Sequence, residues 1–399
     1  MKLRDYQQTA ATQGAEILSK NKILILNFEV RTGKSHIALE IAKTYKNVLF
    51  VTKKQAIKSV QNDYEAAGHT YDITVTNYEN LHKITGKYDL VICDESNEKI
   101  AAYPKPTLNA KRVKGFVSND LMLLTGTLLP ESNSQIFHQL WVSKHSPFNV
   151  FRNFYAFHKQ LGIPKTRYTS YGETKDYSDT PYENIVKYIN PIKLSLTQQE
   201  AGFSSEIKDI VHTIKMKPVT EGLISKLKSD LVIEGQKEVV LADTSVKLMS
   251  KLHQLSSGTV KFDSGATMVI DDTKIQYIKE NFKGKKIAIY YKFKAELDMV
   301  KSAFDLADTI EEFDTSDKNI AFQFISGRSG IKLDKADCIV AMNVDFSSTT
   351  FQQFRARMVT SESKVSEVHW IFSDIGFEKE VLTKVQNKES FTTQTFKKL

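Results

Sequence analysis

Residues 22–35 read KILILNFEVRTGKS, a short apolar run that leads into a glycine-containing turn. The run Lys22–Asn27 predicts a buried strand, and the apolar spacing over residues 37–42 predicts a helix directly after the turn. A strand that turns through a glycine into a helix is the setting of a phosphate-binding loop, because backbone N–H groups and the helix N-terminus both face an anion there. This stretch therefore predicts an α/β fold with a nucleotide site near Gly33.

The side chains of the turn are those that phosphate binding needs. In a loop of this kind, Lys34 neutralises phosphate charge and the Ser35 hydroxyl binds Mg²⁺. The full signature also has a glycine five residues before Gly33, and this chain has Phe28 there. The loop by itself therefore leaves a second interpretation open, an ordinary strand-to-helix turn that contains a lysine.

Short apolar runs alternate with amphipathic segments over residues 1–140. Continuous apolar runs of this kind are typical of a parallel sheet that is covered by helices on both faces. We therefore predict a first parallel-sheet lobe over this range. Its further predicted strands are Asn47–Thr52, Ile73–Val75, Leu90–Cys93 and Leu121–Leu124.

The alternation returns over residues 244–399, which predicts a second and smaller parallel-sheet lobe. Between the lobes, residues 141–243 predict a mainly helical or irregular accessory region. Its run Phe151–Tyr155 fits either an aromatic and basic nucleic-acid surface or the helical packing of the same rings. The predicted second-lobe elements are the strands Lys286–Tyr291, Asn319–Phe324 and Cys338–Met342 and the helix Lys294–Phe304.

Two acidic residues, Asp94 and Glu95, come directly after the apolar run Leu90–Cys93. Strands of a parallel sheet end at one edge, where ligands bind in open α/β folds. Asp94 suits the binding of Mg²⁺, and Glu95 suits the orientation and deprotonation of an attacking water. A solvated acidic loop is the alternative, but a pair placed two predicted strands after a Lys-Ser loop favours the catalytic interpretation. Thr125-Gly126-Thr127 ends the next predicted strand and can hydrogen-bond to the acids.

Composition limits the class of protein without deciding it. The chain has 55 Lys and Arg against 47 Asp and Glu, a net charge of +8, which favours a polyanionic partner or simply solubility. No apolar run approaches the roughly 20 residues of a membrane-spanning helix, and residues 1–5 lack the core of a signal peptide, so we expect a cytoplasmic protein. Cys93 and Cys338 lie in apolar strand-like runs, so neither a disulfide nor a zinc site is expected.

Taken in order, these elements resemble the superfamily-two helicases and translocases, and within them the Swi/Snf-type branch and the small phage helicases related to it. The resemblance covers roughly residues 1–140 and 245–360. It implies two tandem RecA-like lobes, the cofactors ATP and Mg²⁺, and DNA as the partner. The matching first-lobe segments are Leu3–Gln7, Glu29–Ser35, Phe50–Lys53, Val75–Glu79, Asp94–Asn97 and Thr125–Thr127.

The resemblance also implies roles for individual first-lobe residues. Gln7 matches the glutamine that contacts adenine, and Arg31 stands where motif I usually has a glycine, which accounts for the missing glycine of the loop. The implied phosphate-binding residues are Arg31, Thr32, Gly33, Lys34 and Ser35, the metal-binding ones are Ser35 and Asp94, and the catalytic ones are Lys34, Asp94 and Glu95. The implied DNA contacts are Lys53, Thr76 and Tyr78, and the implied coupling residues are Thr125 and Thr127.

In the second lobe, Ile287–Lys292 resembles motif IV, Ile325–Leu333 with Ala336-Asp337 resembles motif V, and Gln353–Arg357 resembles motif VI. These matches imply nucleotide contacts by Gly330, Arg355 and Arg357 and DNA contacts by Lys292, Ser326 and Arg328. Motif VI usually has an arginine four residues after the glutamine and another three residues later, and this chain has Arg357 and Thr360 at those places. The catalytic arginine is therefore Arg355 or Arg357, unless both belong to an exposed basic helix face.

The resemblance implies a monomeric ATP-driven DNA helicase or translocase that acts on single-stranded, forked or junction DNA. A phage-type role in replication, recombination or repair, in the host cytoplasm, is expected on the same ground. Three alternatives remain: a double-strand translocase that does not separate strands, the motor subunit of a restriction system, and a P-loop switch or kinase. The last would need neither the Gln7 segment nor Arg355 and Arg357.

Overall fold

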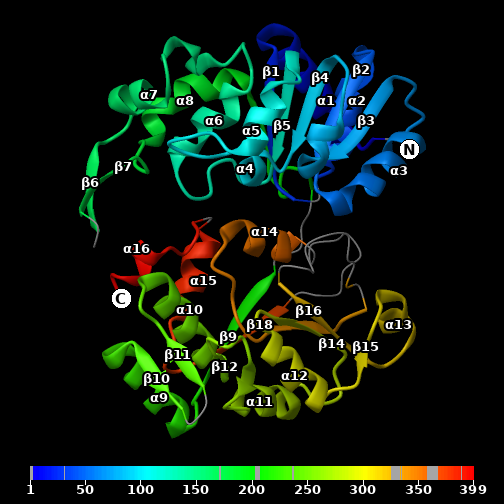
Figure 1. Ribbon diagram of the computed structural model, residues 1–399. Helices are drawn as coiled ribbons and strands as arrows, with labels where there is room; N and C mark the ends of the chain where they lie inside the picture. Colours follow the sequence, from blue (N-terminus) through cyan, green and yellow to red (C-terminus); the bar gives the residue numbers. More distant parts are fainter. Residues whose placement is uncertain are drawn as a thin grey trace. The chain divides into compact units, whose positions relative to one another are not determined.

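The computed structural model describes residues 3–30, 32–169, 172–202, 207–235, 238–324, 333, 335–356, 367–387 and 389–399. Contacts divide the chain into two compact units, Met1–Gly202 and Phe203–Leu399. Each unit contains its own six-stranded parallel sheet with helices on both faces (Figure 1). The predicted pair of tandem parallel-sheet lobes is therefore confirmed.

The sheet of the first unit has the strand order β3-β2-β4-β5-β1-β8. All of its neighbouring strands pair in parallel. The strands are β1 (Ile23–Phe28), β2 (Asn47–Thr52), β3 (Asp72–Asn77), β4 (Tyr88–Asp94), β5 (Val117–Thr125) and β8 (Lys193–Leu196). Both faces of the central strands are covered, which is why their sequences are apolar at nearly every position.

Helices form two separate cores on the two faces of this sheet. One core contains side chains of α1, α2 and α3 with alternate residues of the strands, such as Leu24 and Leu26. The other contains side chains of α5 to α8 with the intervening strand residues, such as Ile23 and Ile25. The helices are α1 (Asp5–Asn21), α2 (Lys34–Ile41), α3 (Ile57–Ala66), α4 (Ser96–Lys99), α5 (Leu108–Lys114), α6 (Ile136–Trp141), α7 (Phe154–Leu161) and α8 (Tyr182–Ile189).

The sheet of the second unit has the order β15-β16-β14-β17-β18-β9. Helices α11 and α12 cover one face, and α10, α14 and α15 contribute to the core on the other. The strands are β9 (Lys208–Ile214), β14 (Ile287–Tyr291), β15 (Leu306–Ala307), β16 (Asn319–Gln323), β17 (Cys338–Ala341) and β18 (Glu367–Ser373). The helices are α9 (Pro218–Asp230), α10 (Ser245–Ser256), α11 (Thr273–Asn281), α12 (Lys294–Ala303), α13 (Ile310–Thr315), α14 (Ser348–Ala356), α15 (Glu378–Gln386) and α16 (Thr393–Phe396).

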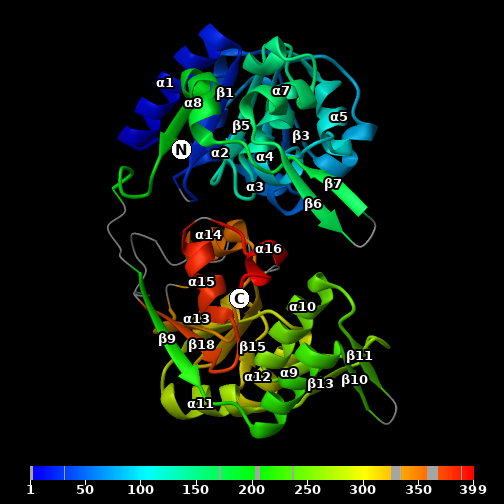
Figure 2. The ribbon, with the colours of Figure 1, turned by 90° about the vertical axis from the view of Figure 1, so that its left-hand side faces the viewer.

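Three small antiparallel pairs complete the described structure. The pair β6 (Lys165–Thr169) and β7 (Gly172–Asp176) projects from the helical side of the first unit (Figure 2). The second unit carries β10 (Val232–Glu234) with β11 (Val239–Leu241) and β12 (Thr259–Lys261) with β13 (Thr267–Val269). Within the described ranges, no helix is both long and apolar enough to cross a membrane.

The observed division differs from the predicted one in the middle of the chain. Residues 141–243 do not form a third compact unit, because β8 pairs with β1 of the first sheet and β9 pairs with β18 of the second. Both β8 and β9 lie at sheet edges and are only partly buried, so they lack the continuous apolar run that identified the central strands. The predicted strands also do not include β18, although four of the five residues of its run VHWIF are apolar.

A buried ion pair holds the second unit together at the end of its sheet. The Lys274 ammonium lies 3.0 Å from the Glu378 carboxylate, and both side chains are completely buried. Lys274 also donates to the Met342 carbonyl, and Glu378 accepts from the backbone N–H of Ser373. The pair therefore connects α11 and α15 to the ends of β17 and β18.

Replacing Lys274 tests this connection. Lys274→Met leaves the Glu378 carboxylate buried without a counter-charge, so we expect the free energy of unfolding to fall by about 3–5 kcal/mol. Urea unfolding, followed by the emission of the buried Trp370, measures the loss. Lys279→Met on the same helix is the control, because Lys279 is exposed. Equal stabilities of the two variants would contradict the role of the pair.

Candidate nucleotide-binding site

The predicted nucleotide-site residues of the first unit come together at the carboxyl edge of its sheet. Strands β1, β2, β4 and β5 end at Phe28, Thr52, Asp94 and Thr125. Asn27 pairs with Thr125, and Asp94 pairs with the preceding residue of β5, so these ends lie side by side. This is the edge at which open α/β sheets bind ligands.

The loop after β1 is shaped by its glycine. Gly33 has a φ of +83° and caps the N-terminus of α2, a backbone conformation that L side chains rarely adopt. A Cβ on Gly33 would lie 2.1 Å from the Gln7 amide nitrogen and would push that amide away. The glycine therefore lets the loop turn sharply into α2, whose first N–H groups then point toward the space in front of the loop.

Gln7 packs directly against this loop. Its amide nitrogen donates to the Thr32 carbonyl at 3.3 Å, and its amide oxygen accepts from the backbone N–H of Arg4 at 3.0 Å. The Tyr6 hydroxyl donates to the same Thr32 carbonyl. The structure thus brings the N-terminal segment to the phosphate loop, and the adenine contact of Gln7 stays a prediction.

Lys34 lies between the loop and the acidic residues. Its ammonium donates to the Phe28 carbonyl at 2.9 Å. Burial lowers the pKa of Lys34, and the negative charges of Glu95, Asp94 and Glu29 oppose that shift. A Cβ on Gly126, in the turn after β5, would lie 3.7 Å from the same ammonium. The loop, the acids and the Thr-Gly-Thr turn therefore surround one cation.

Hydrogen bonds fix the Asp94 carboxylate. One carboxylate oxygen accepts from the Thr52 hydroxyl at 2.7 Å, and the other accepts from the backbone N–H of Glu95 at 3.0 Å. The Asp94 carbonyl accepts from the Tyr78 hydroxyl at 2.6 Å. Thr52 ends β2 and thus places its hydroxyl at the same edge, a supporting role that the sequence did not reveal.

Glu95 has the electrostatic setting of a general base. Burial and the negative charge of Asp94 together raise the pKa of its carboxyl to about 7, against the opposing positive charges of Lys53 and Lys34. Its backbone has a φ of +49°, in the left-handed region that glycine favours. A carboxyl that titrates near neutral pH exchanges protons efficiently there, as a catalytic base must.

The Thr-Gly-Thr turn is hydrogen-bonded to the helix that follows the acids. The Asn97 amide donates to the Thr127 hydroxyl at 3.4 Å, and the Thr125 hydroxyl accepts from the backbone N–H of Thr127 at 3.2 Å. The Ser96 hydroxyl donates to Gln139 of α6 at 3.1 Å. No local pattern identifies Gln139, because its partner Ser96 lies far away in the chain.

The predicted DNA contacts of the first lobe have different environments. Tyr78 is completely buried, and its hydroxyl donates to the Asp94 carbonyl, so its side chain packs within the first unit and its DNA contact stays a prediction. Thr76 is 6% exposed, and Lys53 pairs with Glu98 at 2.9 Å. The DNA contacts of Lys53 and Thr76 stay predictions.

The second unit contains Lys292 and Arg355 among the described predicted residues. The Lys292 ammonium lies 3.4 Å from the Asp345 carboxylate and 3.8 Å from the centre of the Phe346 ring, and its DNA contact stays a prediction. The predicted residues Arg31, Ser326, Arg328, Gly330 and Arg357 lie outside the described residues.

The Arg355 side chain forms an ion pair and a hydrogen bond within the second unit. Its guanidinium pairs with the Asp209 carboxylate of β9 and donates to the Ile207 carbonyl at 3.0 Å. The same carboxylate accepts from the indole N–H of Trp370 and from the Gln386 amide, each at 2.9 Å. Arg355 therefore ties α14 to the edge strand β9, and the catalytic role of Arg355 or Arg357 stays a prediction.

Phe151 and Phe154 of the predicted aromatic surface are 8% and 2% exposed. Their rings pack against Phe157, with centroids 5.6 and 5.9 Å away. These two rings thus belong to the core, in agreement with the packing alternative. Arg152 and Tyr155 of the same run are exposed.

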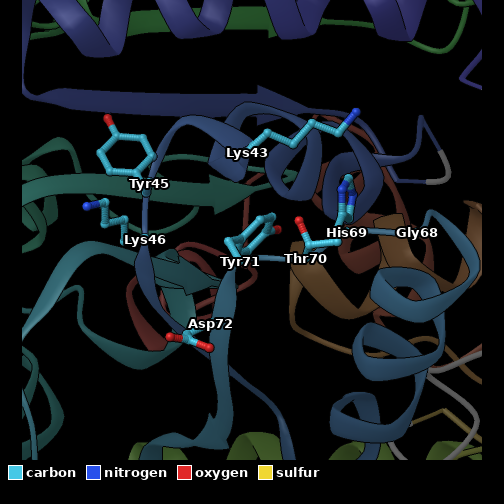
Figure 3. A pocket seen from close by; sticks show the side chains of 8 residues that line it. All are labelled: Lys43, Tyr45, Lys46, Gly68, His69, Thr70, Tyr71 and Asp72. Carbon is cyan, nitrogen blue, oxygen red and sulfur yellow. The ribbon is translucent and has the colours of Figure 1, made fainter.

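A pocket of about 570 Å³ lies elsewhere in the first unit (Figure 3). Its lining residues precede β2 and β3, so it lies at the amino edge of the sheet, and it contains none of the predicted site residues. Ligands of parallel α/β sheets bind at the carboxyl edge, so this pocket is not the candidate nucleotide site. The lining residues are Lys43, Tyr45, Lys46, Gly68, His69, Thr70, Tyr71 and Asp72.

The groups at the carboxyl edge fit a magnesium–nucleotide complex. A helix N-terminus and the Lys34 ammonium suit the phosphates, and the Ser35 hydroxyl and the Asp94 carboxylate are oxygen ligands of the kind that Mg²⁺ prefers. The Ser35 hydroxyl forms no hydrogen bond with any residue that the structure describes.

No protein-family model and no curated protein sequence matches this chain. Among solved structures, the chain is similar to the helicase domain of Hef from Pyrococcus furiosus, with a TM-score of 0.50 and 12% identity over 96% of this chain and 98% of that one. The chain shares the fold of a helicase domain. This likeness confirms the predicted tandem RecA-like fold and, at such low identity, shows the fold alone.

A second similar structure is the SWI2/SNF2 ATPase core of Sulfolobus solfataricus, determined in complex with double-stranded DNA. Its TM-score is 0.47 and its identity 16%, over 97% of this chain and 91% of that one. The predicted placement within the Swi/Snf-type branch and near the small phage helicases stays a prediction.

The assignment of Arg355 can be tested by stability. We expect Arg355→Gln and Asp209→Asn each to lower the free energy of unfolding by about 1.5–3 kcal/mol, because each removes a hydrogen bond to a charged partner. Urea unfolding measures this loss of free energy. The variants are made in a Trp141→Phe background, so that Trp370 is the remaining fluorescent tryptophan. The comparison variant Arg357→Gln should keep its stability and lose ATP hydrolysis. If Arg355→Gln unfolds like the wild type and loses hydrolysis, Arg355 is the catalytic arginine.

Proposed function

We propose that this chain is a DNA-stimulated ATPase that couples ATP hydrolysis to movement along DNA. The observation that carries the proposal is the position of Glu95 at the carboxyl edge of a parallel sheet. Its carboxyl has a pKa of about 7, and it shares that edge with Lys34 and the fixed carboxylate of Asp94. A phosphate-binding loop beside a carboxyl whose pKa is near 7 suits the hydrolysis of a nucleoside triphosphate.

The proposed reaction is attack of water on the γ-phosphorus of ATP. The Glu95 carboxylate orients this water and accepts its proton, the bond between the γ-phosphorus and the bridging oxygen breaks, and ADP and phosphate result. Lys34 and the N-terminus of α2 neutralise phosphate charge as it shifts. Ser35 and Asp94 would hold a Mg²⁺ ion, which would supply further charge neutralisation. Arg357 is the proposed catalytic arginine, because the Arg355 guanidinium is already paired with Asp209.

The Thr-Gly-Thr turn supports a role in coupling. Asn97, two residues after Glu95, is bonded to Thr127, and Ser96 is bonded to Gln139. A change at the acids after hydrolysis is therefore transmitted to the turn after β5 and to α6 through direct contacts. We propose that this connection converts the state of the nucleotide into a movement of the first unit's surface.

A motor that moves over any sequence must bind the phosphates of DNA. The proposed contacts are Lys53 and Thr76 of the first unit and Lys292, Ser326 and Arg328 of the second. Forked, junction or single-stranded DNA, and a role in phage-type replication, recombination or repair, are the proposed substrates and setting. The alternative within the same class is a double-strand translocase that does not separate strands, alone or as the motor subunit of a larger complex.

The pH dependence of hydrolysis tests Glu95. Only the ionised carboxylate accepts a proton, and its pKa is raised to about 7, so kcat/KM should be half-maximal near pH 7 and rise above it. Glu95→Gln should keep ATP binding, lower kcat by about 10²–10⁴-fold and lose this limb of the profile. Glu65→Gln, at an exposed position of α3, is the control. A profile that is flat from about pH 6 to 8 would contradict the assignment.

A panel of nucleic acids tests the motor itself. We expect ATP hydrolysis to rise when DNA is added and to disappear in Lys34→Ala, which removes the cation from the phosphate loop. Fork and four-way junction substrates then separate the alternatives, since a helicase releases a displaced strand and a double-strand translocase does not. If neither DNA nor RNA stimulates hydrolysis, the motor function is refuted and a P-loop switch or kinase becomes the better description.

A further inference from the structure

A second, smaller pocket of about 270 Å³ lies in the helical layer of the first unit, among α5, α6 and the short helix Pro147–Val150. The buried residues Phe137, Phe148 and Phe151 belong to its lining. Lys114, Trp141 and Arg152 also line it and are less buried.

This pocket is separate from the candidate nucleotide site. Lys114 ends α5 shortly before β5 begins, and Trp141 ends α6, the helix that returns after β5. The pocket therefore lies toward the amino end of β5. The loop, Asp94 and Glu95 lie at the opposite, carboxyl end of the sheet.

The lining of the pocket combines the Trp141 ring with two basic side chains. The Lys114 ammonium lies 3.6 Å from the centre of the Trp141 ring, a cation–π contact. Burial lowers the pKa of Lys114. Arg152 is exposed, and neither Lys114 nor Arg152 forms an ion pair with a residue that the structure describes.

The surrounding sequence has almost no negative charge to balance these cations. Between residues 105 and 159, Asp120 and Glu131 are the acidic residues, and Asp120 is turned toward the Tyr45 hydroxyl, 2.6 Å away. A solvated basic surface would explain the charge, but it would not explain a hollow lined by aromatic rings beside it. The basic residues of this range are Lys105, Lys111, Arg112, Lys114, Lys144, Arg152 and Lys159.

We propose that this pocket binds single-stranded nucleic acid, with one unstacked base in the pocket against Trp141 and the flanking phosphates on Lys114 and Arg152. Base stacking on an aromatic ring combined with basic side chains is how proteins hold single strands without reading sequence. The volume, below the roughly 300–1,000 Å³ of pockets for drug-sized ligands, suits a single planar base. The site goes beyond the proposed ATPase, because it holds a strand without nucleotide hydrolysis.

Tryptophan fluorescence gives a direct test. The chain has two tryptophans, and Trp370 is completely buried, so the half-buried Trp141 reports on the pocket. We expect an oligothymidylate of about eight nucleotides to quench Trp141 emission in the absence of ATP, since stacked bases quench indole and single-strand sites cover ~4–16 nucleotides. Trp141→Phe should lose this signal. No quenching in the wild type would overturn the proposal.

Matched double variants separate the pocket from general basicity. Lys114→Gln/Arg152→Gln should raise the Kd for the oligothymidylate at least about tenfold and reduce the slope of log K against log salt by about 1.4, as two lost phosphate contacts require. Lys20→Gln/Lys46→Gln removes the same charge at two exposed positions outside the pocket and should bind like the wild type. Equal weakening by both double variants would overturn the proposal.

Thymidine monophosphate distinguishes a strand from a free nucleotide. If it quenches Trp141 as tightly as the oligonucleotide does, the pocket is a mononucleotide site and the single-strand proposal is wrong. Much weaker quenching by thymidine monophosphate than by the oligonucleotide supports the proposal. Because these titrations contain no ATP, their result is independent of the proposed ATPase: failure of DNA to stimulate hydrolysis would refute the motor and leave the quenching unaffected.

Discussion

The parallel pairing of strands is the constraint on which the rest of this structure depends. In both units the pairing brings all strand ends of one kind to one edge, and both faces of the sheet are covered by helices. Backbone hydrogen bonds are satisfied within the sheet, so the polar groups that act on a ligand are left to the loops at the strand ends. The loop after β1, the acids after β4 and the turn after β5 meet for this reason.

At that edge, the charges of the candidate site are only partly compensated. Burial alone would discharge both Lys34 and Glu95, and each is opposed by the other's charge. The net result is a carboxyl that titrates near neutral pH beside a cation that suits phosphate. Hydrogen bonds from Thr52 and Tyr78 hold Asp94 in place meanwhile, so the two adjacent acids have different environments and can have different roles.

The second unit uses similar residues for a different purpose. Lys274 with Glu378, and Arg355 with Asp209, are ion pairs that connect helices to strands of the same sheet. Such pairs cost desolvation and are stabilising only when the remaining polar groups are also satisfied, as the additional bonds of Glu378 and Asp209 satisfy them. A charged residue in a motif is therefore not by itself evidence of catalysis. In the first unit, conversely, the cations around Trp141 have no such partners among the described residues.

The sequence by itself determined the two sheets and the position of the candidate nucleotide site, because both depend on local patterns. Apolar runs specify buried parallel strands, and a glycine turn or an acid pair directly after such a run falls at the carboxyl edge whatever the rest of the chain does. Edge strands β8 and β9 carry no such pattern, since one side of each is unpaired, and the division of residues 141–243 between the units followed from their pairing alone. Only the tertiary structure showed that Tyr78 is buried beneath Asp94, that Arg355 is held by Asp209, and that Lys114 and Trp141 meet at one pocket. Contacts between residues far apart in the chain decide these roles, and no local pattern records such contacts.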